Sequence, residues 1–161
     1  MMITCRRIKQ LFTCVALALM LNSCDGGVVY DSYGHVDSDG WDKGDTLFFD
    51  VPPVKSSGNY AFSIGLRTNS SFPFMSLSVV VERQINPGNK VYADTLKCRL
   101  ADEKGHLLGR GISCYQYDFD IPPVDLRQGD SLRVSVRHIM RRETLPGISD
   151  VGLKVATLVK P

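Results

Sequence analysis

The strongest constraint on the fold is a strict alternation of apolar and polar residues that recurs along most of the chain. In residues 131–137, the sequence SLRVSVR places an apolar residue at every second position. Successive side chains of a β-strand point to opposite faces, so this period of two predicts a strand with one buried face. Comparable alternation occurs in residues 47–51, 60–66, 75–81, 92–100, 115–121 and 151–155.

Turn-forming residues separate these segments. Asn86-Pro87-Gly88-Asn89 is typical of a turn, because proline presets φ and glycine accepts a positive φ. Pro52-Pro53 and Pro122-Pro123 are predicted to close two of the strands, and no window has a helical period. We therefore predict an all-β fold: a single antiparallel β-sandwich, of jelly-roll or immunoglobulin-like type, over residues 45–161.

The first 23 residues have the pattern of a bacterial lipoprotein signal peptide. A basic start precedes an apolar run from Leu11 to Leu21, which is too short for a lasting transmembrane helix. Ser23 is the small residue before the predicted cut, and Cys24 is the predicted lipidation site. The alternative is an ordinary secretory signal in which Cys24 happens to follow the cut. Several acyl chains on Cys24 would anchor the protein firmly in a membrane.

A polar linker is predicted between the anchor and the sandwich. Residues 24–44 comprise Cys24 and a tether rich in Gly and Asp, and the chain is expected to join the fold near Trp41. A single Trp beside a Gly is more often a core residue than a ligand platform. Both interpretations of Trp41 stay open from the sequence.

Removal of the signal peptide changes the charge and the cysteine count. The full chain has 19 Lys and Arg against 17 Asp and Glu, but residues 1–23 hold three of the basic residues and no acid. The remaining 138 residues therefore have a net charge of −1, and neither nucleic acid nor an anionic membrane surface is an implied partner. Two cysteines remain besides Cys24. Cys98 and Cys114 could form a disulfide in an exported protein or stay as free thiols.

No motif points to catalysis, a metal or a cofactor. The histidines His35, His106 and His138 form no His-x-x-x-His pair, so zinc has no local signature, and the acids of residues 37–45 lack EF-hand spacing. There is no Gly-x-Ser-x-Gly elbow. Paired carboxylates stay open, because their separation depends on the fold. We expect a protein that is not an enzyme and holds no cofactor or metal.

Several motifs together resemble the gliding motility lipoprotein GldH family of Bacteroidota. They are, in chain order, Cys24, residues 30–33 (YDSY), 40–43 (GWDK), 66–67, 72–74 (FPF), 94–96, 100–111, 136–141 (VRHIMR) and 145–153 (LPGISDVGL). The resemblance covers nearly all of the chain after Cys24. It implies a cell-envelope lipoprotein needed for gliding and linked to type IX secretion, although similar proteins occur in non-motile bacteria. It implies no catalytic residues.

The leading hypothesis is a non-enzymatic protein that binds envelope proteins of this machinery. We expect it to be anchored by lipid and to face the periplasm from the outer membrane. The partner surface is predicted from the distinctive motifs to comprise Trp41, Phe72, Phe74, Arg137, His138, Arg141 and Asp150. Arg137 to Arg142 could alternatively be a solvated strand end, and His138 a core histidine. The alternative function is a glycan- or peptidoglycan-binding sandwich that stacks sugars on Trp41.

Overall fold

The structure is a computed structural model, in which residues 27–158 are described. Ten strands and no helix occur in this part of the chain, so it contains no helix able to cross a membrane. The strands are β1 (Val28–His35), β2 (Trp41–Asp42), β3 (Leu47–Val51), β4 (Gly58–Asn69), β5 (Ser76–Asn86), β6 (Lys90–Arg99), β7 (Cys114–Leu126), β8 (Ser131–His138), β9 (Thr144–Leu145) and β10 (Ile148–Thr157). The predicted signal peptide and Cys24 lie outside the described residues.

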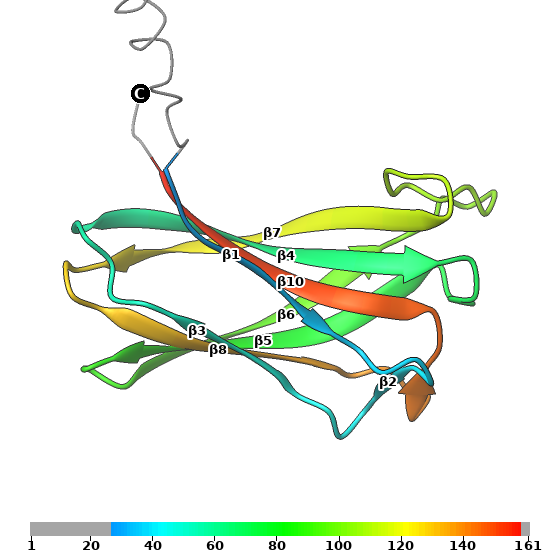
Figure 1. Ribbon diagram of the computed structural model, residues 1–161, viewed down its shortest axis with the longest axis horizontal. Coiled ribbons are helices and arrows are strands. Elements are labelled where there is room, and N and C mark those ends of the chain that lie inside the picture. Colours follow the sequence, from blue (N-terminus) through cyan, green and yellow to red (C-terminus); the bar gives the residue numbers. More distant parts are fainter. Residues whose placement is uncertain (1–26, 159–161) are drawn as a thin grey trace, which may run out of the picture.

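The strands form two antiparallel sheets that pack face to face (Figure 1). The first sheet has the order β1–β10–β4–β7 and the second the order β3–β8–β5–β6, while β2 and β9 form a short separate ribbon. Apart from the ribbon and the β5–β6 hairpin, each strand crosses to the opposite sheet from the one before it. This is the strand order of a jelly roll, not of an immunoglobulin domain. The prediction of an antiparallel β-sandwich is confirmed, and the jelly roll is the correct one of the two types.

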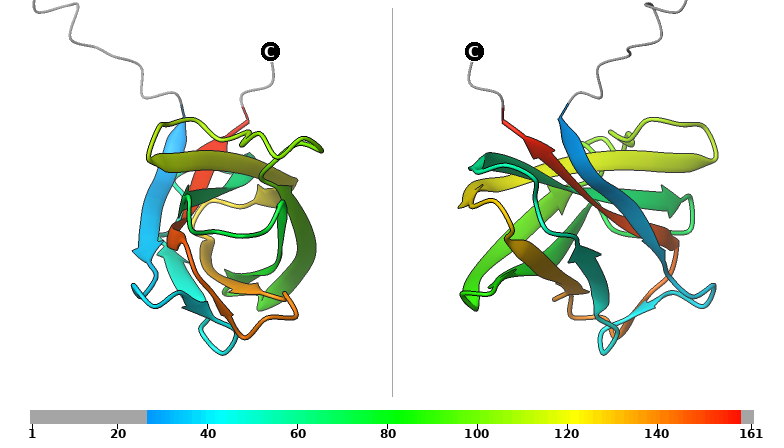
Figure 2. Two further views of the ribbon diagram at one scale, coloured as in Figure 1. Left: turned by 90° about the vertical axis from the view of Figure 1, so that its right-hand side faces the viewer. Right: turned by 60° about the vertical axis from the view of Figure 1, so that its left-hand side comes forward.

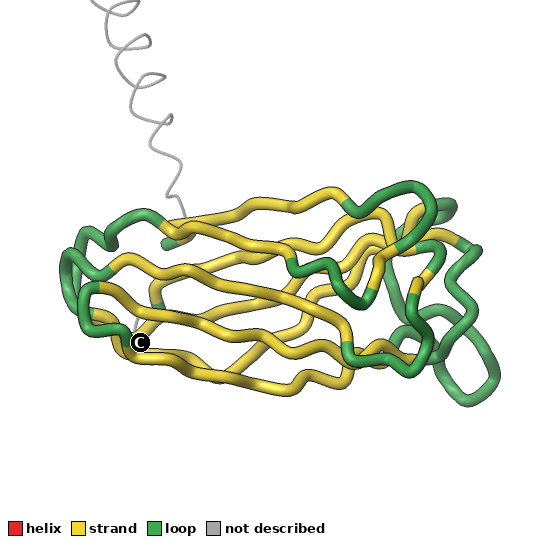
Figure 3. The backbone as a smooth tube through the Cα atoms, turned by 90° about the horizontal axis from the view of Figure 1, so that it is seen from below, coloured by secondary structure: helices red, strands yellow, loops and turns green. Residues whose placement is uncertain are grey.

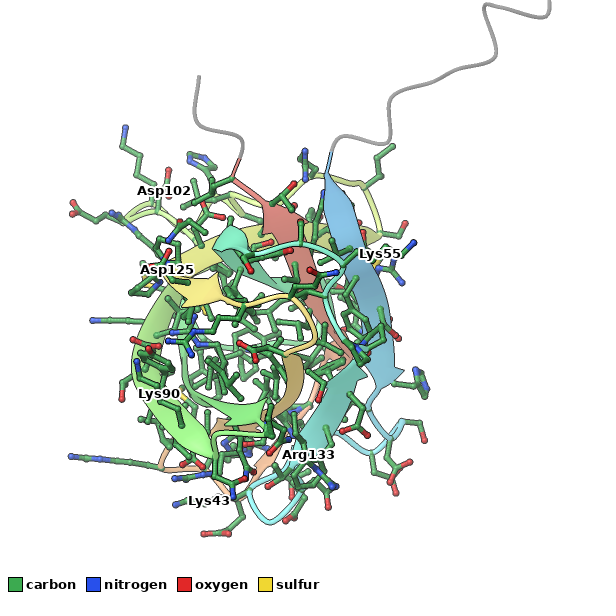
Figure 4. The ribbon with its side chains drawn as sticks, turned by 90° about the vertical axis from the view of Figure 1, so that its left-hand side faces the viewer. Lys43, Lys55, Lys90, Asp102, Asp125 and Arg133 are labelled. Carbon is green, nitrogen blue, oxygen red and sulfur yellow. The ribbon has the colours of Figure 1, made fainter. Side chains whose placement is uncertain are left out.

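The core lies between the two sheets, which curve around a common interior (Figure 2). Each sheet turns its alternating apolar residues inward: the first sheet contributes Phe62, Ile64 and Val151, and the second Val79 and Val136. Charged side chains such as Lys90 and Asp125 lie around the outside (Figure 4). All the strands and core residues that the structure describes fall within residues 28–157, so a chain lacking the predicted signal peptide retains every one of them.

Two segments differ from the sequence-based prediction. Residues 28–35, assigned to the tether, form β1, which pairs with β10 along its whole length. The strand was missed because its inward positions include Ser32 and Gly34, which give no apolar alternation. The sandwich therefore starts at Val28, before the predicted boundary at residue 45. In addition, β7 continues through Pro122-Pro123 to Leu126.

The prolines fit because β7 is an edge strand. Its pairing with β4 shifts register between Tyr60 and Phe62, opposite Val124 and Ile121. The two prolines therefore lie at an irregularity, where an edge strand tolerates the loss of two N–H donors. Proline at this position interrupts the ladder locally without ending the strand.

The two ends of the sandwich differ in their loops. One end carries four connections, residues 36–46, 70–75, 100–113 and 139–147, and we call it the four-loop end. The described termini and the shorter turns lie at the other end (Figures 1 and 3). There Thr157 N donates to the Gly27 carbonyl oxygen at 2.8 Å. The four-loop end therefore points away from the side on which the N-terminal segment enters the domain.

Candidate functional site

Two residues that were predicted to lie on a partner surface are buried in the core. Trp41 and His138 are each only 1% exposed and pack edge to face, with their ring centroids 5.3 Å apart. The Trp41 indole N–H donates to the Asp45 carbonyl oxygen at 3.0 Å, which holds the β1–β3 loop against the sandwich. Placing Trp41 and His138 in a partner surface was therefore wrong, and the interpretation of both as core residues holds.

The His138 ring is unusual for a core residue because both of its nitrogens are buried without a hydrogen bond in the part of the chain that the structure describes. Neither Nδ1 nor Nε2 has a hydrogen-bond partner of good geometry within the described residues, although the backbones of Trp41 and Glu143 lie nearby. Burial disfavours the charged imidazolium and lowers the pKa of His138 below its usual value. A neutral ring packed against Trp41 is consistent with a structural role for His138.

The other predicted surface residues lie at or near the four-loop end. Phe72 and Phe74 are half-buried and pack edge to face at 5.6 Å. Gly147 has a positive φ of 81°, and a Cβ added to it would overlap the Phe72 backbone. Glycine is therefore required where the 139–147 loop meets the 70–75 loop. Arg137 and Arg141 are exposed. Within residues 27–158, neither arginine makes a cation–π contact with Phe72 or Phe74, so the four residues do not form one cluster in this way.

No disulfide joins Cys98 and Cys114, the pair that the sequence left open. Cys98 is fully buried on the inner face of β6, whereas Cys114 is exposed at the start of β7, and both are free thiols. Burial raises the pKa of the Cys98 thiol to about 12, so this cysteine behaves as a small core residue. Of the two possibilities that the sequence left open, the structure has two free thiols.

A cleft of about 590 Å³, lined mostly by polar and charged residues, lies on the outer face of the first sheet, toward the four-loop end. All four strands of that sheet contribute to it, and the β6–β7 loop closes one side. The lining residues are Asp31, Tyr33, Ser63, Gly65, Arg67, Arg110, Gln116, Asp118, Gly152, Leu153 and Lys154. We call this feature the sheet cleft.

Antiparallel pairing arranges the sheet cleft in two adjacent rows. The first row, crossing β1, β10, β4 and β7, is Tyr33, Gly152, Gly65 and Asp118. The second row, closer to the four-loop end, is His35, Asp150, Arg67 and Gln116, and Arg110 extends it by bridging to Gln116. Residues that are far apart in the sequence therefore meet on one face.

Two glycines make the floor of the cleft. Gly152 and Gly65 are direct partners on the central strands, and the Tyr33 ring lies across both of them. A Cβ on Gly152 would lie 2.6 Å from Tyr33 Cε1, and one on Gly65 would overlap the phenol. The Gln116 side-chain amide donates to the Tyr33 hydroxyl oxygen at 3.2 Å. The Tyr33 ring is therefore held flat against the backbone of the two glycines, which have no side chains to keep it away.

Arg67 covers the other face of this ring. Its guanidinium carbon lies 3.9 Å from the Tyr33 ring centroid. The glycine backbones are too close to the ring to leave space for a guanidinium beneath it, so Arg67 must stack on the solvent side. Burial, followed by the Asp118 carboxylate, raises the pKa of Tyr33 above its usual value, while Arg67 opposes this shift.

The remaining charges of the cleft are mixed. Arg110 pairs with Asp118, and Asp150 accepts from His35 Nδ1 at 3.2 Å while lying 3.9 Å from Arg67 Nη1. No group of three or more His, Cys, Asp or Glu residues that could hold a metal ion occurs in residues 27–158. The cleft is suited to recognising a charged or hydrogen-bonding ligand.

Of the residues predicted from the sequence to form a partner surface, Asp150 alone lies at this site, on the rim of the cleft. Tyr33, Arg67 and Arg110 all belong to motifs on which the family resemblance rests, yet no spacing rule connects them. The one usable signal was glycine at an outward position of a strand, as at Gly65 and Gly152, which marks a close approach of another group.

Comparisons with known proteins agree with the resemblance. The family model described as GldH lipoprotein matches residues 28–155. The curated gliding motility lipoprotein GldH of Flavobacterium johnsoniae is 30% identical over 156 residues, which covers 92% of this chain and 97% of that protein. The chain belongs to the GldH lipoprotein family. As a GldH family member it is a lipoprotein associated with the cell envelope.

Solved structures give weaker similarities. A family 35 carbohydrate-binding module from Clostridium thermocellum is 13% identical, with a TM-score of 0.42 over 80% of this chain and 92% of the module. A ruminal GH26 endo-β-1,4-mannanase is 15% identical, with a TM-score of 0.39 over 80% of this chain, which spans only 20% of the enzyme. At these scores the similarities carry no argument about ligand or activity.

Proposed function

We propose that this GldH family protein is a non-enzymatic lipoprotein that supports gliding motility, and the type IX secretion linked to it, by binding another envelope protein. It is anchored through lipid on Cys24 and faces the periplasm from the outer membrane. The observation that carries the proposal is the sheet cleft. Four segments of the family resemblance, residues 30–33, 66–67, 109–111 and 145–153, converge on it.

The composition of the cleft favours a protein partner. Tyrosine and arginine are the residues most enriched at the energetic centres of protein interfaces, and here Tyr33 and Arg67 form a fixed central pair. Exposed Arg110 and Lys154 surround them. This resembles a polar, preorganised docking site more than an enclosed small-molecule pocket.

The position of the cleft suits an anchored protein. The lipidated segment would enter the domain at Val28, and Tyr33 lies five residues further along β1, roughly 17 Å away at the rise of an extended strand. The four-loop end lies further still (Figure 1). A partner approaching from the periplasm would therefore meet the cleft and the loops without contacting the anchor.

The structure does not favour the alternative glycan-binding function. That hypothesis rested on Trp41 as a stacking platform, and Trp41 is buried. Tyr33, the aromatic residue in the cleft, has one ring face on the glycines and the other under Arg67. Neither side chain offers a free ring face for a sugar.

Site-specific photocrosslinking in the native host tests the proposal. A photoreactive residue at Ser63, which lines the cleft, is expected to capture a discrete envelope protein in intact cells. The matched control is Thr95, which lies on the outer face of the second sheet. Equal capture from both positions, or none from Ser63, would refute the protein-binding role. Labelled palmitate that still enters the Cys24→Ala variant would refute the anchor.

A further inference from the structure

We propose that Arg67 and Arg110 form a carboxylate-binding site that takes an acidic, extended segment of a partner protein. The inference rests on the proposed function, because it assigns a chemistry to the partner of the same cleft. It is carried by the contrast between how firmly Arg67 is positioned and how little of its hydrogen-bonding capacity is used.

Arg67 is held in place by a dedicated platform. The Tyr33 ring under its guanidinium is fixed by two glycines and by the Gln116 amide. Stacking on an aromatic ring restricts an arginine without consuming its N–H donors, because the contact uses the face of the planar guanidinium. The donors at the guanidinium edge therefore stay available, and the entropy cost of ordering them on binding is small.

Those donors are not used within residues 27–158. The Arg67 guanidinium donates no hydrogen bond there, and its nearest carboxylate oxygen, on Asp150, is 3.9 Å from Nη1 and beyond hydrogen-bond distance. Asp150 instead accepts from His35 at 3.2 Å. The Arg67 side chain is 39% exposed, so a ligand can reach it. An ordered arginine with free donors is suited to a bidentate carboxylate.

Arg110 supplies the second position. Arg67 and Arg110 flank Gln116 in one row across the sheet, so their backbones are about 10 Å apart at the usual spacing of strands. The Arg110 guanidinium already holds a carboxylate, that of Asp118. This exposed ion pair contributes little to stability, so an incoming carboxylate can compete for Arg110 at small cost.

The two positions predict a pattern in the partner. Alternate residues of an extended chain lie about 7 Å apart on the same side. Two long arginine side chains spaced by about 10 Å can lean together to that separation. The fitting ligand is therefore an extended segment with Asp or Glu at alternate positions. Lys154 lies two rows away from Arg67, where it is paired across the strands with Asp31, so the acidic positions are assigned to Arg67 and Arg110 alone.

The experiment is an NMR titration of the chain from Asp25 to Pro161 with blocked synthetic peptides. The probe is Ac-Gly-Glu-Ser-Glu-Gly-NH₂, with Ac-Gly-Gln-Ser-Gln-Gly-NH₂ as the uncharged control, and the readout is the side-chain Nε–H signals of the arginines. The acidic peptide is expected to shift the Arg67 and Arg110 signals saturably. Arg67→Gln should weaken its binding at least about tenfold, since a charge-assisted hydrogen-bonded pair is lost.

Arg133 on the second sheet provides a matched control. Its guanidinium also stacks on an aromatic ring, that of Phe48 at 4.9 Å, and its nearest carboxylate, on Asp50, is also 3.9 Å away. Arg133→Gln should leave peptide binding unchanged. Equal losses from Arg67→Gln and Arg133→Gln would show nonspecific attraction and overturn the proposal.

Two further titrations identify the class of ligand. Sodium glucuronate or inorganic phosphate that binds as tightly as the acidic peptide would overturn the assignment to a protein segment. Absence of any peptide-induced shift at Arg67 would overturn the carboxylate site itself. The crosslinking experiment is independent of these titrations. If Ser63 captures a partner but the peptide causes no shift at Arg67, the carboxylate site is rejected and the protein-binding function is retained.

Discussion

A buried ion pair between Arg83 and Asp94 gives the sharpest test of the core. Arg83 is on the inner face of β5 and only 1% exposed, although it is charged. Its Nη1 donates to the Pro122 carbonyl oxygen at 2.6 Å, and its Nη2 donates to Asp94 on β6. Its guanidinium carbon lies 4.9 Å from the Phe62 ring centroid. Arg83 thus links the second sheet to β7 of the first.

The perturbation is Asp94→Asn, which keeps the shape of the side chain and removes its charge. Removing one partner of a buried ion pair costs about 3–5 kcal/mol, because the other charge is left uncompensated. Asp94 is 27% exposed and Arg83 keeps its bond to Pro122, so the expected cost lies at or below the lower end of that range, about 2–3 kcal/mol. With a urea m-value of about 1.5–2 kcal/mol/M, the denaturation midpoint should fall by about 1–2 M.

The control is the same substitution in an Arg83→Met background. Methionine fills the space without a charge, so Asp94 has no buried partner there and its replacement should cost less than about 1 kcal/mol. Equilibrium urea denaturation of the four variants completes a double-mutant cycle. An equal cost of Asp94→Asn in both backgrounds would refute the pairing as the source of the effect.

Three other outcomes follow from the structure. Gly152→Ala should displace the Tyr33 ring and lower the pKa of Tyr33 toward its usual value, which an NMR pH titration measures. The same substitution should change the free energy of unfolding by less than about 1 kcal/mol, because the added Cβ meets a side chain and not the backbone. The lowered pKa of His138 means that the unfolded chain binds a proton first as the pH falls below about 6.5. The free energy of unfolding should therefore decline there by at most about 1.4 kcal/mol per pH unit. In the His138→Phe variant, the part of this pH dependence that comes from His138 should disappear. A maleimide should label Cys114 and spare Cys98 until the protein unfolds, as mass spectrometry can report.

The sequence was sufficient for the strands that bury one regular face. Tyr60, Phe62 and Ile64 on β4 alternate with small residues, and the structure buries all three. β1 was missed for a physical reason: it is an edge strand, and pairing through its backbone places little demand on the side chains it turns inward. Its inclusion in the first sheet depends on β10, which lies more than 110 residues further along the sequence, and no local pattern contains that information.

The missed strand and the missed site have the same cause. The sheet cleft depends on cross-strand register, which brings Tyr33 of β1 beside Gly152 of β10 and Gly65 of β4. Alternation predicts which face a residue occupies, but it does not predict which residues of other strands lie opposite. Replacing the two glycines by serine would leave every predicted strand unchanged, since both positions face outward. The Tyr33 ring could then no longer lie on the backbone, and Arg67 would lose its platform. The fold of this chain is therefore encoded in the alternation, whereas the cleft is encoded in two outward glycines and the register that joins them.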